Sequence, residues 1–291
     1  MKLAAFPKCF MDQLVVDHTM TVFDWIEMAA DLPVDGLEMY SGFLESFEPA
    51  YIERVRRAIE RRGLEMPMFC CSPDFTSPDA EERRRQIETE KKMIDATAAL
   101  GGGFCRALSG QRRPEVSRAQ GVKWVAECLQ ELTGYAAQKN VILALENHYK
   151  DNYWRHPEFA QKSDVFIEIL SEVDSPWLGA QFDPSNTILA GEDPIDLLHK
   201  IKRRVVTMHA SDRRLKPGHT MEELRRSEDS VGYAAILSHG VIGSGLNDFS
   251  KIFFILRSVG FDGWVSIEDG VNGFDEIRKS AEFLTPFIRG S

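Results

Sequence analysis

The feature that most constrains the fold is a regular alternation of short apolar runs with long amphipathic stretches. Runs rich in Val, Ile, Leu and Phe are typical of buried parallel strands, and the longer stretches predict helices that pack against them. We expect strands at 2–6, 36–40, 65–70, 104–108, 141–145, 178–182, 205–208 and 264–267. We expect helices from Thr21 onward and over 49–62, 79–100, 115–139, 164–173, 194–200, 248–259 and 277–287.

Eight such units favour a closed α/β barrel, the (β/α)8 or TIM barrel, over an open doubly wound sheet. The sequence has no GxGxxG after the first strand and no P-loop, which excludes the commonest nucleotide-binding open sheets. A chain of 291 residues suits one barrel, and no linker or low-complexity tract divides it. We therefore expect a single domain over 1–291, with an extended loop after the seventh strand at about 210–247.

The net charge and the cysteines limit the binding partners and the cellular compartment that we expect. The net charge is −10 and the pI is about 5.3, which argues against nucleic acid and anionic membranes as partners. No apolar run approaches the roughly 18 residues of a membrane span, and the first residues do not resemble a signal peptide. Five cysteines without CxxC spacing indicate reduced thiols, so we expect a cytoplasmic protein.

Polar residues stand directly after the strands predicted at 141–145, 178–182, 205–208 and 264–267. They are Glu146, Asp183, His209 and Glu268. The carboxyl ends of barrel strands meet at one mouth, where three crowded carboxylates would repel one another unless a cation neutralises them. Each residue also has a simpler interpretation: a helix N-cap for Asp183, a structural histidine for His209 and a solvated carboxylate for Glu268. Together they predict a divalent metal site, with carboxylate and imidazole ligands that suit Mn²⁺, Co²⁺, Mg²⁺ or Zn²⁺.

The segments around these residues, together with VIGSGLNDFSKIF and GFDGWVSIEDG, resemble the sugar phosphate isomerase/epimerase family of xylose-isomerase-like barrels over nearly the whole length. That family includes ketose 3-epimerases, hydroxypyruvate isomerase and inosose dehydratase. The resemblance implies that Glu146, Asp183, His209 and Glu268 are the metal ligands, with Mn²⁺ the favoured ion. It also implies a sugar or sugar-derivative substrate and a homodimer or homotetramer.

The leading hypothesis is a metal-dependent sugar isomerase or epimerase. The substrate would chelate the metal through a carbonyl and a neighbouring hydroxyl, and the cation would stabilise the enediolate formed when a C–H proton is removed. Glu146 and Glu268 would act as the paired acid and base on opposite faces of the substrate. The position of reprotonation would decide between epimerisation and isomerisation.

Further residues are expected around the substrate. His148 follows Glu146 closely and would act as a general acid or base, bind a hydroxyl group, or have a structural role. Arg213 would bind a carboxylate or phosphate, or form a surface salt bridge. Trp154 would form part of the pocket wall or pack within its own loop. The remaining substrate-binding candidates are Glu38, which ends the second strand, Asn186, which stands where ketose 3-epimerases usually carry a histidine, and Asp212.

Two other classes of enzyme remain open. A metal-dependent lyase, decarboxylase or dehydratase acting on a 3-oxo sugar or a sugar acid would use the same metal and enediolate, and Arg213 and His148 would suit such a substrate. Some AP endonucleases share the barrel, but they need additional histidines for a three-metal cluster. Here the third strand ends in Cys70 and Cys71 instead, which disfavours that class.

Overall fold

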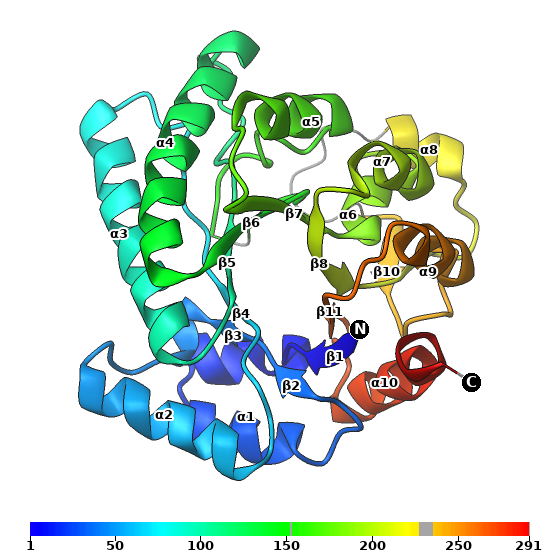
Figure 1. Cartoon of the computed structure of the whole chain (residues 1–291). Helices are drawn as coiled ribbons and strands as arrows, with labels where there is room; N and C mark the ends of the chain where they lie inside the picture. Colours follow the sequence, from blue (N-terminus) through cyan, green and yellow to red (C-terminus); the bar gives the residue numbers. More distant parts are fainter. Residues whose placement is uncertain (152, 227–234, 291) are drawn as a thin grey trace.

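The computed structural model describes residues 1–151, 153–226 and 235–290, and its centre is a parallel barrel (Figure 1). The hydrogen-bonded strand order is β2-β1-β11-β8-β7-β6-β5-β4-β3, with every pair parallel. The strands are β1 (Lys2–Ala5), β2 (Gly36–Leu37), β3 (Met39–Tyr40), β4 (Met68–Cys70), β5 (Phe104–Ala107), β6 (Ile142–Glu146), β7 (Leu178–Phe182), β8 (Val205–Ala210) and β11 (Trp264–Ile267).

The barrel closes through one interrupted strand. The predicted strand at 36–40 is divided at Glu38 into β2, which pairs with β1, and β3, which pairs with β4. Because the two pieces are consecutive in the chain, the two ends of the hydrogen-bonded order belong to the same strand. The amide of Leu37 also donates to the carbonyl oxygen of Glu65 at 2.9 Å, across the seam. The expected (β/α)8 TIM barrel is confirmed.

Helices surround the barrel, as Figure 1 shows. They are α1 (Val22–Ala29), α2 (Pro49–Arg61), α3 (Ala80–Ala99), α4 (Arg118–Lys139), α5 (Ser163–Glu172), α6 (Pro184–Leu189), α7 (Pro194–Ile201), α9 (Phe249–Ser258) and α10 (Phe274–Arg289). The predicted start at Thr21 is a capping box, in which the hydroxyl of Thr21 accepts from the amide of Asp24 and the Asp24 carboxylate accepts from the amide of Thr21. Helix α6 was not predicted, because its sequence directly follows a strand end and spans only six residues.

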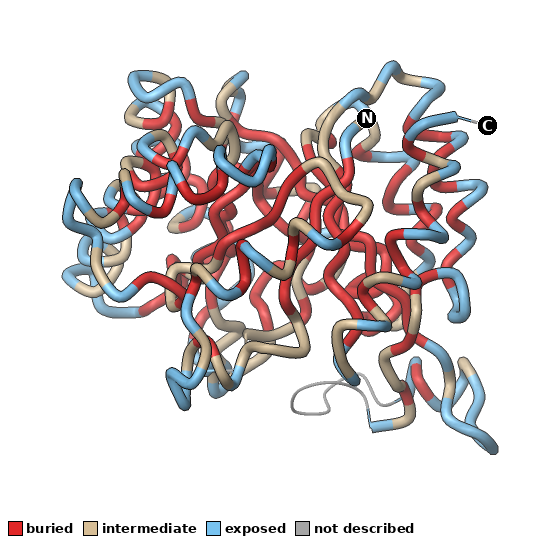
Figure 2. Tube along the Cα trace, turned by 90° about the horizontal axis from the view of Figure 1, so that it is seen from below, coloured by how far each residue is buried: buried red, intermediate tan, exposed pale blue. Residues whose placement is uncertain are grey.

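The hydrophobic core lies between the strands and the helices. Trp25, Phe69 and Phe166 are fully buried there, and Figure 2 shows buried residues along the strands and on the inner faces of the helices. Burial of apolar surface on this scale is the main driving force for folding. No helix in the described part of the chain is long and apolar enough to cross a bilayer.

The connection predicted at 210–247 contains structure of its own. An antiparallel pair is formed by β9 (Arg213–Leu215) and β10 (Leu237–His239), and α8 (Met221–Arg226) lies between them in sequence. Another unpredicted region follows β1, where short helical turns at Lys8–Phe10 and Asp12–Val16 carry Lys8 to the mouth of the barrel.

Candidate metal centre

The four predicted ligands lie at the carboxyl ends of neighbouring strands. Glu146 is the last residue of β6, and Asp183 and Glu268 directly follow β7 and β11. His209 is the penultimate residue of β8. All four side chains belong to buried residues, of which Glu268 is the most exposed at 9%.

The structure brings these four side chains together. One ligand atom from each lies within 4.8 Å of those of the other three. The Nδ1 atom of His209 is 3.1 Å from Oε1 of Glu146 and 3.7 Å from Oε2 of Glu268. The convergence that the strand pattern predicted is therefore present in the folded chain.

The charged groups in this cluster shift one another's pKa values. Burial and the negative charges of Glu268 and Glu146 raise the pKa of Asp183 to about 7. Burial opposes the protonation of His209, but the surrounding glutamates, Glu38 first among them, raise its pKa well above the usual value. The cluster thus favours an additional positive charge at its centre.

A divalent metal ion fits this set of donors. Two atoms bonded to the same ion at about 2.2 Å lie at most about 4.4 Å apart, so the four atoms need only a slight contraction to share one ion. Three carboxylates and one imidazole are suitable ligands for Mn²⁺, Co²⁺, Mg²⁺ or Zn²⁺. The residues present therefore constitute a candidate divalent-metal site.

Asp183 is a helix N-cap, as its simpler interpretation predicted, and it also lies in the candidate cluster. Its Oδ1 atom accepts the amide of Asn186 at 3.0 Å, so it caps α6, and it also accepts the hydroxyl of Ser211 at 2.9 Å. The amide group of Asn186 points to Glu146, with Nδ2 3.4 Å from Oε1. Asn186 thus lies beside the cluster, where it contacts the candidate ligand Glu146 and does not line the cavity.

Sequence reasoning missed two cations that pair with the glutamates. The guanidinium of Arg106 donates from Nη1 to Oε2 of Glu146 at 3.1 Å, and Nζ of Lys8 lies 3.1 Å from Oε1 of Glu268. Burial by itself raises the pKa of both carboxyl groups, but neighbouring cations outweigh it and lower both pKa values. For Glu146 these cations are chiefly His209 and Arg106. For Glu268 they are chiefly Lys8 and His209. Arg106 had a detectable signal, since a charged residue inside the apolar run at 104–108 needs a buried partner.

A cavity opens beside the cluster, and His148 lines it. The wall is formed by Phe6, Lys8, Met11, Tyr40, Arg106, His148, Lys150, Asp151, Tyr153 and Glu268. Nδ1 of His148 is 3.6 Å from Oε2 of Glu158, a buried carboxylate whose other oxygen accepts the amide of Ser109 at 2.7 Å. Burial opposes protonation of His148, but the charges of Glu146 and Glu158 raise its pKa.

Other predicted site residues lie away from this cavity wall. Glu38 is fully buried behind His209, with Oε2 2.8 Å from Nε2 of that imidazole. The carboxylate of Asp212 accepts the amides of Gly243, Gly245 and Asn247, so it orders that loop.

Arg213 and Trp154 were also expected around the substrate, but neither lines the cavity. Arg213 is buried at the start of β9, where its backbone pairs with His239. Trp154 is half-buried in its loop, and its neighbour Tyr153 lines the cavity instead. A larger groove between α2 and α3, lined by Phe47 and Ile52 among others, contains none of the candidate ligands.

The fold and the site define a TIM-barrel protein with a candidate divalent-metal centre at the carboxyl ends of its strands. A family model described as the xylose isomerase-like TIM barrel matches residues 26–287, and the chain belongs to that family.

Individual relatives are distant but cover most of the chain. An inosose dehydratase of Clostridium perfringens is 23% identical over 232 residues, which are 76% of this chain and 74% of that protein. A D-tagatose 3-epimerase-like protein of known structure has a TM-score of 0.77 at 19% identity, covering 99% of this chain and 97% of that one. The IOLI protein, solved with a binding zinc atom, has a TM-score of 0.76 at 16% identity, with coverages of 99% and 98%.

Proposed function

We propose that the protein is a divalent-metal-dependent lyase that removes water from an oxidised sugar or a sugar acid. The observation that carries this proposal is the place of His148, on the wall of the cavity beside the four candidate ligands. A leaving hydroxyl needs a proton donor, and an imidazole in this position can supply it. Glu146 and Glu268 are each paired with a cation that favours the ionised carboxylate, which suits metal ligation and proton removal.

Glu146, Asp183, His209 and Glu268 would hold the metal, with Mn²⁺ the favoured ion. When bound, such an ion supplies positive charge that stabilises the negative charge developing on the carbonyl oxygen of the substrate. Glu268, the most exposed ligand, removes the proton from the carbon next to the carbonyl. The electron pair of the broken C–H bond forms the new C=C bond to the next carbon. The hydroxyl group on that next carbon leaves with the electron pair of its C–O bond, and His148 donates a proton to the departing oxygen. Glu158, with Oε2 3.6 Å from Nδ1 of His148, raises the pKa of that imidazole and so favours its proton-donating form.

The cavity wall favours an oxidised or acidic substrate. Lys8, Arg106 and Lys150 all contribute to the wall. Lys8 and Arg106 are paired with candidate ligands, whereas Lys150 has no carboxylate partner within the described residues. Lys150 thus suits the anionic group of a substrate, the role that the sequence suggested for Arg213. The dehydratase name of the Clostridium perfringens relative agrees with a loss of water.

A second candidate is the isomerase or epimerase reaction. It is favoured by the placement of Glu146 and Glu268 at the ends of β6 and β11, two strands separated by β7 and β8. Carboxylates that approach from different sides could remove a proton from one face of a carbon and return it to the other.

The mass of the product separates these candidates. Mn²⁺-loaded protein is incubated with keto sugars and sugar acids, and a product lighter by one water supports the lyase. An isomer of equal mass as the sole product would reject the lyase in favour of the second candidate. Glu268→Gln should abolish turnover. Glu90→Gln, which changes a buried residue that does not line the cavity, is the control that keeps it.

Deuterium exchange assigns the two proton transfers. In D₂O, His148→Ala should lose elimination by about 10²–10⁴-fold while the substrate still exchanges its C–H proton. Glu268→Gln should lose both. If His148→Ala eliminates water at the wild-type rate, His148 is not the proton donor.

We also propose a cytoplasmic location and a homodimeric or homotetrameric assembly. The five cysteines are all free, which fits a reducing compartment. Size-exclusion chromatography with light scattering measures the assembly directly.

A further inference from the structure

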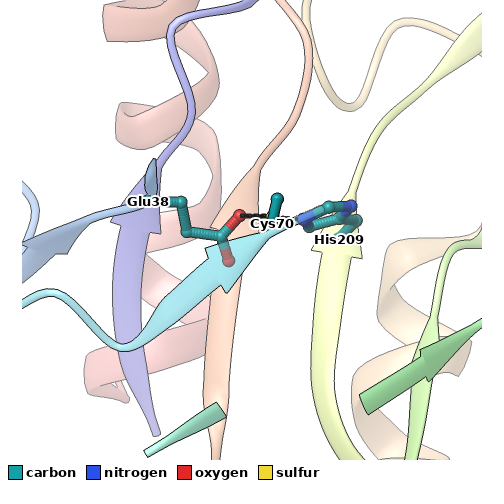
Figure 3. A group of neighbouring side chains, drawn as sticks. All are labelled: Glu38, Cys70 and His209. Atoms are coloured by element: carbon teal, nitrogen blue, oxygen red, sulfur yellow. Dashed lines mark hydrogen bonds and ion pairs between the residues drawn. The ribbon is translucent and has the colours of Figure 1, made fainter. Parts of the chain in front are cut away.

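Glu38 stands directly behind the only histidine of the candidate metal cluster. Figure 3 shows its carboxylate pointing to the ring of His209, with Cys70 beside it. The Oε2 atom of Glu38 is 2.8 Å from Nε2 of His209, and both residues are fully buried. The thiol of Cys70 is a more distant neighbour, 3.8 Å from the same oxygen.

The two nitrogens of His209 face different surroundings. Nδ1 points to the ligand carboxylates of Glu146 and Glu268, at 3.1 and 3.7 Å, while Nε2 points to Glu38. An imidazole binds a metal only through a nitrogen that carries no proton, so ligation through Nδ1 requires the proton on Nε2. That is the nitrogen for which Glu38 provides an acceptor.

The backbone gives Glu38 this position. It lies at the break between β2 and β3, and its amide donates to the carbonyl oxygen of Ala5 at 2.9 Å. Its second carboxylate oxygen, Oε1, is buried and has no hydrogen-bond partner among the described residues. A buried carboxylate with one oxygen unsatisfied is costly, and its contact with His209 is the interaction that offsets the cost.

We propose that Glu38 is a positioning residue that fixes His209 in the Nε2–H tautomer and thereby strengthens metal binding at Nδ1. The inference rests on the metal site of the proposed function. Carboxylates behind metal-bound histidines orient the ring and make it a better donor, and their loss typically weakens metal affinity about 10–100-fold. Glu38 thus acts through His209 and does not contact the substrate.

Titration with Mn²⁺ tests this role without any substrate. Glu38→Gln keeps the volume and an acceptor but removes the charge, and it should bind Mn²⁺ about 10-fold or more weakly than the wild type. Glu90→Gln, which makes the same substitution at another buried glutamate outside the cluster, should bind Mn²⁺ as the wild type does. Calorimetry measures the affinities, and circular dichroism checks that each variant is folded.

The outcomes separate the inference from the function on which it rests. If wild-type protein binds Mn²⁺ and Glu38→Gln binds it equally well, Glu38 has no positioning role while the metal site stands. If wild-type protein binds no Mn²⁺, Co²⁺, Mg²⁺ or Zn²⁺, both proposals fail.

A measurement on the wild type alone guards against a variant that does not fold. Long-range ¹H–¹⁵N spectra of the histidine rings, with His209 assigned from the spectrum of His209→Asn, report which nitrogen carries the proton. With Zn²⁺ as the diamagnetic probe, we expect the Nε2–H tautomer. A proton on Nδ1 in the metal-loaded protein would overturn the inference.

Discussion

At the scale of single residues, the mouth of the barrel is organised by buried opposite charges. Arg106 is an example: its side chain is 7% exposed, and it contacts Glu146 through Nη1, the carbonyl oxygen of Cys71 through Nε and the hydroxyl of Ser72 through Nη2. One side chain therefore joins the ends of β4, β5 and β6. Removal of one partner of such a pair leaves the other charge buried and uncompensated.

Arg106→Met should lower the free energy of unfolding by about 3–5 kcal/mol, because buried Glu146 would lose one of its two neighbouring cations. Urea unfolding of the chelator-treated protein measures this. Arg118→Met is the matched control: Arg118 pairs with Asp164 and Glu168 at the surface and is 50% exposed, so its loss should be below about 1 kcal/mol. Equal losses in the two variants would contradict this account of Arg106.

At the scale of elements, α3 packs a carboxylate against two strands. Glu90 of α3 is buried, and the thiols of Cys71 and Cys105 lie 3.1 and 3.7 Å from its oxygens, beside β4 and β5. Burial raises the pKa of Glu90 to about 7, although hydrogen bonds from the two thiols oppose the rise. The three groups form a second cluster of metal-type side chains, but with three ligands rather than the four of a structural zinc site.

The raised pKa predicts a pH-dependent stability. Between the ordinary pKa near 4.5 and the folded value near 7, the unfolded chain releases the Glu90 proton while the folded chain keeps it, so this group costs stability as the pH rises. Above pH 7 the cost is complete. Glu90→Gln should therefore raise the free energy of unfolding, relative to wild type, more at pH 8 than at pH 5. An equal difference at both pH values in urea titrations would contradict the shifted pKa.

At the scale of the whole molecule, barrel closure assembles the site from distant segments. Lys8 and Glu268 are 260 positions apart in sequence and meet because β1 pairs with β11. Glu38 and His209 are 171 positions apart and face one another across the barrel. The metal cluster thus belongs to the folded state, and a metal that binds it should stabilise the entire fold.

Mn²⁺ at 100 times its dissociation constant should add about 2.7 kcal/mol to the free energy of unfolding, since the unfolded chain lacks the site. Thermal unfolding should show a rise in Tm of several degrees that a chelator reverses. His209→Asn should lose most of this response. A Tm that does not change with Mn²⁺, Co²⁺, Mg²⁺ or Zn²⁺ would argue against the metal site.

The sequence by itself determined the barrel and the four residues at its strand ends. Both follow from local patterns: apolar runs mark the buried strands, and a polar residue that directly follows a run must lie at the carboxyl end. Glu146, Asp183, His209 and Glu268 were predictable for that reason.

Only the tertiary structure decided which side chains surround those four. Lys8 stands in an irregular turn, Glu38 faces the histidine instead of the cavity, and Tyr153 lines the wall in place of Trp154. None of these contacts has a periodic signature, because each depends on how barrel closure and loop geometry orient residues that are far apart in the chain. Strand ends are a local property of the sequence, whereas partners across the mouth of a barrel are set by the packing of the complete fold.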